Sequence, residues 1–465
     1  METSMRKRVI GVVVAVVLVL VTAVMPVPEG TTREGILSLG VFGGALALWI
    51  CNSMPMSVSA FGMMALMPLL SVMTLNDVFL QFGGTAFFFA IATFAVSIAL
   101  ENTTIPLRIC HALTSRTKSN PSALVVAMMF ACGIVSAFMS NLATCIVFLS
   151  IAHGLLEANN TKPGESNLGR CLMIGLPAAS GIGGLMTPAG TPGNALIIGL
   201  LQSEAGIDIT FLQWIGLFAP IGLFTILVAS VWITRVFKPE KVSDEAIADL
   251  ESRLAEAGNK LTPIEKRTLA IIAIMIVCWL AGTWVPAMNV TIVAIFGMVA
   301  MFLPGIGVLE WKDTASRINW DLSFTIGSVG VLIGAMSTTG IMTWIVESLL
   351  SGIGGMNIIL AFFIIGLVVC VIRAFIPTAP AIVALFGPPL LALGPIIGAT
   401  PMAILYLPAM WACCPMLLWI EPIDLFSYGW GYYKPLDVLK FGAVPSFICV
   451  VVMSFVPMYC ALFGL

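Results

Sequence analysis

Two short stretches place polar or charged side chains at the centres of long apolar runs, 237 residues apart. The stretch V-I-R-A-F-I-P-T-A-P-A occupies residues 371–381 and carries Arg373, the single charge of its apolar run. The stretch V-S-A-F-M-S-N-L-A-T occupies residues 135–144 and has Ser136 at the position of Arg373. An arginine at membrane depth is costly unless it faces a partner or a water-filled cavity. The pair therefore indicates a transporter with one site between two related halves.

The composition requires that these stretches lie in a membrane protein. The chain has 465 residues, of which 59% are hydrophobic and 9% are charged. A soluble protein of this size needs more charge to cover its surface. We therefore predict an all-α polytopic membrane protein with about 11 transmembrane helices. The net charge of -2 provides no basic surface for phosphates, so nucleic acid is not an expected partner.

The apolar run at 122–155 is too long for a single membrane span. Its 34 residues would extend about 50 Å as one helix, against a hydrocarbon core of roughly 30 Å. The run must therefore turn inside the membrane, and residues 136–144 supply a polar turn near its centre. Exposed backbone at that depth is tolerated only where protein or a cavity covers it. We predict a re-entrant hairpin at 122–155 and a second one at 356–393.

Two further helices are predicted to be broken at membrane depth. The segment 171–201 is interrupted by G-G-L-M-T-P-A-G-T-P-G-N at residues 183–194. Glycine and proline at this density break a helix, and the freed carbonyls and half-helix ends can face a ligand. The second half is predicted to contain the corresponding break at 406–424.

The repeated hairpins and breaks predict a chain built from two inverted repeats. A-L-E-N-T-T-I at 99–105 resembles A-M-S-T-T-G-I at 335–341, in step with the two hairpins. The distribution of basic residues predicts a plasma-membrane protein with a cytoplasmic N-terminus and an extracytoplasmic C-terminus. The expected parts are an N-terminal membrane helix at 1–34, a first repeat at 35–237, a cytoplasmic linker at 238–267 and a second repeat at 268–465.

The first hairpin turn offers side chains that suit both a sodium ion and an anion. Ser136, Ser140, Asn141 and Thr144 present hydroxyl and amide oxygens of the hard type that sodium accepts. The sequence G-T-P-G-N at 190–194 supplies an opposing wall, where glycine lets the backbone approach closely. An alternative is that these small and polar residues only pack helices together, as they commonly do in membranes.

These motifs carry a resemblance to a known family. S-N-L-A-T at 140–144, together with G-T-P-G-N at 190–194, resembles the divalent anion/sodium symporter family, the INDY-type dicarboxylate, citrate and sulfate transporters. G-W-G-Y-Y-K-P-L-D-V-L-K-F-G at 429–442 also resembles the segment after the family's second broken helix. The resemblance implies a homodimer in which a transport domain moves past a scaffold domain in an elevator-like displacement.

The resemblance also implies roles for individual residues. A first sodium site would be lined by Ser136, Ser140, Asn141 and Gly190. By the same resemblance, Asn141 and Thr191 would contact a substrate carboxylate. We predict a substrate site drawn from both hairpin turns and both breaks, namely Ser140, Asn141, Thr144, Thr191, Asn194, Arg373, Thr378 and Pro422.

The second half departs from the family pattern. Residues 377–379 read P-T-A where Ser-Asn-Thr is expected, and residues 421–424 read E-P-I-D in place of Thr-Pro-Pro-Asn. In the first turn Leu142 replaces the expected threonine. Arg373 falls at a position that resembles a residue of the family's second sodium site, so we hypothesise that its guanidinium replaces that ion. Fewer sodium ions, or none, would then be coupled, and the chain would work as an exchanger.

Arg373 also has an alternative explanation. It could form a buried salt bridge with Glu421 or Asp424, fixing the hairpin against the broken helix. Carboxyl groups at membrane depth can bind protons, which leaves proton coupling open.

The sequence as a whole predicts a secondary active transporter of small di- or trivalent anions of dicarboxylate, citrate, sulfate or sulfonate type. No cofactor is expected beyond Na+ as a coupling ion. An alternative is a sodium/proton or arsenite-type antiporter that uses Asp424 or Glu421. No H-E-x-x-H motif or Ser/His constellation occurs, so the chain is not expected to be an enzyme.

Overall fold

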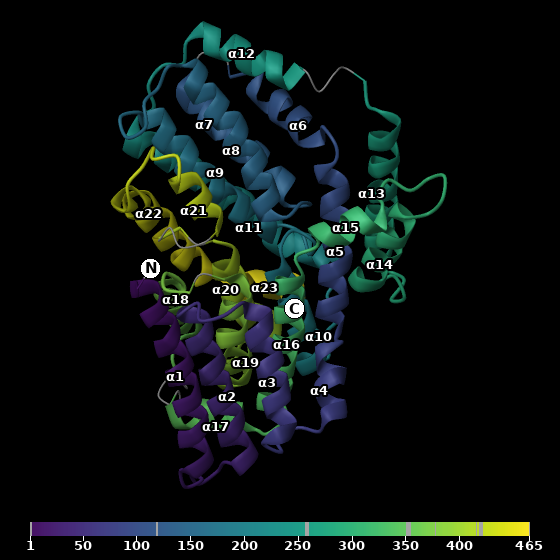
Figure 1. Ribbon diagram of the computed structural model, residues 1–465, viewed down its shortest axis with the longest axis vertical. Coiled ribbons are helices and arrows are strands. Elements are labelled where there is room, and N and C mark those ends of the chain that lie inside the picture. The colour runs from purple at the N-terminus through teal and green to yellow at the C-terminus, as the bar shows by residue number, and fades with distance from the viewer. Residues whose placement is uncertain are drawn as a thin grey trace.

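The structure, a computed structural model, is built from helices (Figure 1). It describes residues 2–117, 120–255, 260–349, 355–376, 378–414, 416–417 and 422–464, and these contain no strand. Nine helices in this part of the chain are long and apolar enough to cross a membrane. This confirms the predicted all-α polytopic membrane protein, whereas the number of 11 spans stays a prediction.

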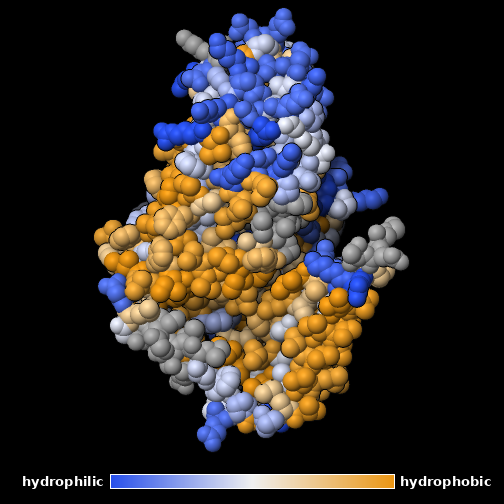
Figure 2. Space-filling model, turned by 90° about the vertical axis from the view of Figure 1, so that its left-hand side faces the viewer, coloured by the Kyte–Doolittle hydropathy of each residue, from blue (hydrophilic) through white to orange (hydrophobic). Residues whose placement is uncertain are grey.

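The first six helices begin with an apolar helix that is largely exposed. Only 11% of the membrane-length window of α1 is buried, and its surface is dominated by valines. Figure 2 shows the face on which α1 lies, where hydrophobic residues form a broad area below a hydrophilic end. Such a surface is compatible with lipid. The helices are α1 (Glu2–Val24), α2 (Arg33–Ile50), α3 (Met56–Leu69), α4 (Leu75–Phe82), α5 (Thr85–Glu101) and α6 (Ile105–Thr114).

The next six helices contain the first hairpin and the first broken helix. The chain turns between Ser136 and Asn141, which we call the first turn. The broken helix is interrupted between Leu185 and Pro192, which we call the first interruption. The side chain of Asn120 caps the helix that opens the hairpin, which satisfies one of its free backbone amides. The helices are α7 (Pro121–Ser136), α8 (Asn141–Ala158), α9 (Asn167–Leu185), α10 (Pro192–Ala205), α11 (Phe211–Phe237) and α12 (Asp244–Ala255).

Five helices follow the linker. Thr262 and Glu265 form a capping box at the start of the first of them, and Asn289 and Asn319 cap two of the others. Gly340 has a positive φ, which glycine adopts without strain, and it separates two helices of this group. The helices are α13 (Pro263–Ala281), α14 (Val290–Met301), α15 (Trp311–Arg317), α16 (Trp320–Thr338) and α17 (Ile341–Leu349).

The last six helices repeat the order of a helix pair followed by an interrupted helix. The pair turns after Arg373, and the interruption lies between Cys413 and Pro422. Tyr406 is inside the helix that precedes this interruption. The helices are α18 (Ile358–Arg373), α19 (Ala379–Ile397), α20 (Pro401–Cys413), α21 (Pro422–Tyr428), α22 (Pro435–Met453) and α23 (Val456–Ala461).

The helices pack into two groups that meet along α5 and α16. Helix α16 packs on α2, α3, α4 and α5, and α5 packs on α14. In the other group α9 packs on α7, α8, α11 and α20. Figure 1 shows α7, α8, α9 and α12 toward the top, with α1, α2, α3 and α4 in the lower part. Helix α10 contacts α5 and α16 on one side and α19 and α20 on the other, so it lies at the boundary between the groups.

Candidate functional site

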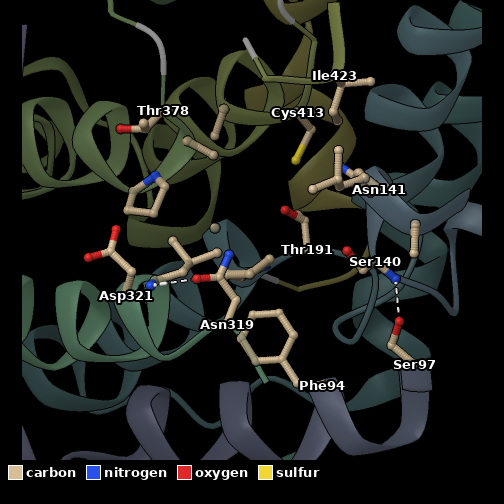
Figure 3. A pocket seen from close by; sticks show the side chains of 18 of the residues that line it. Phe94, Ser97, Ser140, Asn141, Thr191, Asn319, Asp321, Thr378, Cys413 and Ile423 are labelled. Carbon is tan, nitrogen blue, oxygen red and sulfur yellow. Dashed lines mark hydrogen bonds between the residues drawn. The ribbon is translucent and has the colours of Figure 1, made fainter. Parts of the chain in front are cut away.

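A cavity of about 480 Å³ lies where both turns and both interruptions meet. Its walls include Ser140 and Asn141 from the first turn and Thr191 from the first interruption. Thr378 comes from the second turn, and Cys413 from the end of α20. Figure 3 shows these side chains around the cavity, with Ser97 and Asp321 of α5 and α16 on the facing wall. Four chain segments that are distant in the sequence therefore form one site.

Three helices begin at the wall of this cavity. They are α8, α10 and α19, and their N-cap residues are Ser140, Thr191 and Thr378. None of these three side chains bonds to the first turn of its own helix. Helix N-termini carry free N–H groups and the positive end of the helix dipole, which together favour an anion. The cavity is therefore suited to a small anion held by backbone amides and hydroxyl groups.

Behind the first turn, three neutral oxygen atoms lie close together. The Ser136 hydroxyl donates to Asn141 Oδ1 at 2.9 Å and lies 3.1 Å from the Ser180 hydroxyl oxygen. The Ser180 hydroxyl in turn donates to the main-chain oxygen of Asn141 at 2.7 Å. Ser136 and Ser180 are both fully buried. This cluster of hard oxygen ligands is of the type that binds sodium at half-helix ends in secondary transporters.

Two glycines, Gly184 in the last turn of α9 and Gly190 in the first interruption, allow the turn to approach this closely. A Cβ atom at Gly184 would overlap the Asn141 amide, and one at Gly190 would overlap the carbonyl group of Gly184. The buried amide of Asn194 donates to the carbonyl oxygens of Gly184 and Thr187, both at 2.8 Å. Asn194 therefore holds the two sides of the interruption together from behind the cavity wall.

The second turn has a guanidinium group where the first turn has the Ser136 hydroxyl. The side chain of Arg373 is 2% exposed. Its Nε donates to the carbonyl oxygen of Trp411 at 2.9 Å, and its Nη1 donates to that of Ile376. One acceptor lies near the end of α20 and the other in the turn after α18. The cation thus connects the second hairpin to the second interrupted helix.

The comparison with protein families identifies the family of the chain. The family model described as "Sodium:sulfate symporter transmembrane region" matches residues 6–464, nearly the whole chain. The chain belongs to the sodium:sulfate symporter family. This confirms the family resemblance noted in the sequence, and it makes the chain a multi-pass membrane transporter and not an enzyme.

Two relatives of this sodium:sulfate symporter family member have low sequence identity to it but cover nearly all of its length. The sodium-dependent dicarboxylate transporter of Staphylococcus saprophyticus is 23% identical over 475 residues, covering 97% of this chain and 90% of the relative. That of Staphylococcus aureus is also 23% identical, over 478 residues, covering 97% of this chain and 91% of the relative. These relatives match over nearly the same length, although the sequences have diverged widely.

Solved structures show the same fold at lower identity. MtrF of Neisseria gonorrhoeae superimposes with a TM-score of 0.58 at 13% identity, covering 96% of this chain and 94% of that one. The YdaH transporter of Alcanivorax borkumensis gives a TM-score of 0.53 at 14% identity, with 98% of both chains covered. Both likenesses concern the fold of this sodium:sulfate symporter family member.

Two further candidate residues of this family member, Thr144 and Asp424, are not part of the described cavity wall. Thr144 is fully buried one turn into α8, and its hydroxyl has no hydrogen-bond partner in the described part of the chain. Pro422 begins α21. The main-chain oxygen of Asp424 accepts hydrogen bonds from the hydroxyls of Ser427 and Tyr433. Glu421 lies outside the described residues, as does Pro377.

Several cavity residues of this family member were not singled out by the sequence. Ser97 and Glu101 on α5 line the cavity, together with Arg317, Asn319 and Asp321 near the start of α16. A signal for Glu101 was present, because it is a charged residue at the end of an apolar run and inside a repeated motif. Ser180 had no such signal, since a lone serine in a glycine-rich helix usually serves only packing.

Proposed function

We propose that this chain carries small di- or trivalent anions of dicarboxylate, citrate, sulfate or sulfonate type across the membrane by secondary active transport. The observation that carries the proposal is the cavity of about 480 Å³ with the N-termini of α8, α10 and α19 at its wall. Its volume is within the range of small-molecule sites. The hydroxyls of Ser140, Thr191 and Thr378 would add directed hydrogen bonds to the anion's oxygens.

Sodium is the proposed coupling ion, in keeping with the sodium-dependent relatives. The oxygens of Ser136, Asn141 and Ser180 support one sodium position behind the first turn. At the second turn the guanidinium of Arg373 binds the carbonyl oxygens that a second ion would otherwise coordinate. Sodium coupling would therefore be reduced by one ion, because the positive charge is already supplied by the protein.

The two packing groups support an elevator-like movement. The group that contains α7–α11 and α18–α22 would be the transport domain, and the group that contains α1–α5 and α13–α17 would be the scaffold. A small cavity at the boundary between the groups allows bound anion and sodium to travel with the transport domain. A homodimer built through the scaffold is part of the same proposal.

Uptake into proteoliposomes tests the proposal. Purified protein would be reconstituted into liposomes loaded with the same unlabelled anion, and uptake of radiolabelled succinate, citrate or sulfate measured with and without an inward sodium gradient. We expect saturable uptake of at least one anion, with a sodium dependence close to first order. Protein-free liposomes serve as the negative control, and Gly184→Ala protein, in which the added methyl group would overlap the Asn141 amide, is expected to take up less anion.

Two outcomes would reject the proposal. One is uptake of none of the three anions by protein that is monodisperse and folded. The other is proton movement on addition of sodium in the absence of any organic or inorganic dianion. The second outcome would favour the alternative of a sodium/proton antiporter, for which Asp424 or Glu421 is the candidate proton carrier.

A further inference from the structure

A chain of polar groups connects the first hairpin turn to the scaffold helix α5. The main-chain N–H of Ser140 donates to the Ser97 hydroxyl oxygen at 2.7 Å, as Figure 3 shows. The Ser97 hydroxyl donates to Glu101 Oε1 at 3.0 Å. The other carboxylate oxygen of Glu101 accepts from Arg317 Nη2 at 2.8 Å. We call Ser97, Glu101 and Arg317 the α5 relay.

The α5 relay places a negative charge one hydroxyl away from a helix N-terminus. Ser140 is the N-cap of α8, so its N–H group lies at the N-terminus of that helix, which is the end that favours an anion. Ser97 is buried, and both it and Glu101 line the cavity. The N–H group of Ser140 is therefore already bonded, through Ser97, to a carboxylate of the protein itself. An anion that enters the cavity has to compete with this bond.

The α5 relay also crosses the boundary between the two packing groups. Ser97 and Glu101 belong to α5, which packs on α14 and α16, whereas Ser140 belongs to the hairpin that packs on α9. Any displacement of the hairpin along α5 breaks the bond between Ser97 and Ser140. The bond is therefore made in this conformation and lost when the proposed transport domain moves.

We propose that the α5 relay acts as an internal substitute for the substrate anion and retains the empty transport domain, so that this carrier runs mainly as an anion exchanger. The proposal rests on the proposed function. A substrate carboxylate or sulfate oxygen that takes the Ser140 N–H displaces Ser97 and repels Glu101, whose charge remains paired with Arg317. The loaded domain is then free to move. Without an anion, the bond to Ser97 forms again and opposes the return of the empty domain.

The test compares two modes of efflux from proteoliposomes loaded with radiolabelled succinate. Exchange is measured with unlabelled succinate outside, and net efflux is measured with none outside. Net efflux requires the empty transport domain to return. Wild-type protein is therefore expected to show much faster efflux of labelled succinate in exchange than in net efflux. The readout is the ratio of net efflux to exchange, which does not depend on the amount of active protein.

Removal of the α5 relay is expected to raise this ratio. Ser97→Ala should raise it about fivefold, the factor that one net hydrogen bond is worth, and Glu101→Gln, which keeps an acceptor oxygen but removes the charge, should raise it by a smaller factor. Ser97→Thr keeps the hydroxyl and should restore the wild-type ratio. Thr93→Val is the matched control, because Thr93 is one turn away on α5 and its hydroxyl donates to the Ala90 carbonyl of its own helix. An unchanged ratio in both Ser97→Ala and Glu101→Gln would overturn the proposal.

A thermal unfolding measurement separates this proposal from the proposed function. Ser97→Ala should lower the apparent melting temperature of the protein without anion, relative to Thr93→Val, and lower it less with saturating succinate or sulfate. If wild-type protein exchanges no anion at all, the proposed function fails and the melting comparison still decides the relay. Equal melting temperatures of Ser97→Ala and Thr93→Val without anion would then show that the relay does not hold the hairpin.

Discussion

The two hairpin turns occupy related positions in the chain but differ in their charge. Behind the first turn lie neutral oxygens from Ser136, Ser180 and Asn141. The Ser136 hydroxyl oxygen lies 2.9 Å from Asn141 Oδ1 and 3.1 Å from the Ser180 hydroxyl oxygen. Behind the second turn lies the guanidinium of Arg373, bonded to two main-chain carbonyl oxygens. We propose that the oxygens at the first turn bind a cation, whereas the second turn contains a positive charge permanently.

This difference concerns how a transporter balances the charge of its substrate. A mobile cation brings its own gradient to the transport cycle and leaves the site after each passage. A guanidinium neutralises the substrate equally well but cannot dissociate, since arginine stays protonated at all accessible pH values. Under this proposal, one turn would contribute a sodium ion that is driven by its gradient, and the other turn would contribute a positive charge that stays with the protein. Removal of Arg373 should therefore make the sodium dependence of uptake steeper, whereas disruption of the first turn should weaken it.

The largest effect is expected from converting the second turn to the first. Arg373→Ser removes the cation and leaves the carbonyls of Trp411 and Ile376 without this donor, at a cost of about 1–3 kcal/mol for each buried group. Uptake at low sodium should fall by more than about tenfold. High sodium should restore part of it, with a steeper sodium dependence, because an ion can now occupy the vacated position. Sodium titration of uptake measures both.

Arg373→Lys is the control for charge without the planar guanidinium. It should keep the shallow sodium dependence of the wild type, although with weaker uptake, because an ammonium group lacks the fork of donors. Identical turnover and sodium dependence in Arg373→Ser and the wild type would contradict the substitution of an ion by Arg373.

The second largest effect is expected at the first turn. In Gly184→Ala the new methyl group overlaps the Asn141 amide, so the turn must shift and the oxygen cluster must open. Sodium-dependent uptake should fall about tenfold, which corresponds to a local rearrangement that costs about 1.4 kcal/mol. Gly62→Ala on α3 is the matched control, because open space surrounds that glycine. Isothermal titration with sodium would show whether the loss is one of ion binding; unchanged sodium affinity would contradict it.

Much of the fold could be predicted because membrane physics restricts it strongly. The apolar composition fixes the all-α class, since only helices and closed barrels satisfy the backbone in lipid. The helix ends at Ser136 and Asn141 lie inside the run whose length forces a turn. The interruption between Leu185 and Pro192 lies in the stretch that is rich in glycine and proline. Length and helix-breaking residues are local properties, so a sequence displays them directly.

The candidate site could be predicted only in part, because contacts between distant segments are not local. Thr191 and Thr378 line one cavity although 187 positions separate them in the chain. Their motifs indicated polar turns, whereas the α5 wall with Ser97 and Glu101 depended on which helix packs against those turns. The burial of Arg373 against main-chain carbonyls was equally hidden, since carbonyl acceptors carry no sequence signature.

The smallest effect is expected from Ser180, the third member of the oxygen cluster. Ser180→Ala removes the donor to the main-chain oxygen of Asn141 and one oxygen near Ser136, but leaves the packing of the turn intact. A net hydrogen bond of about 1 kcal/mol corresponds to a roughly fivefold weaker sodium affinity. The maximal uptake rate at saturating sodium should remain close to that of the wild type.

The contrast with Ser230→Ala decides whether this effect belongs to the cluster. Ser230 is also fully buried, and its hydroxyl donates to the Leu227 carbonyl within α11, away from both turns. Both variants lose one buried hydroxyl, so a general loss of stability would affect them alike. A shift of the sodium curve in Ser180→Ala alone would place the ion at the first turn. Equal sodium titration curves in the two variants would mean that the sodium ion does not bind at the first turn. The two turns would then differ in packing and not in how they balance the charge of the substrate.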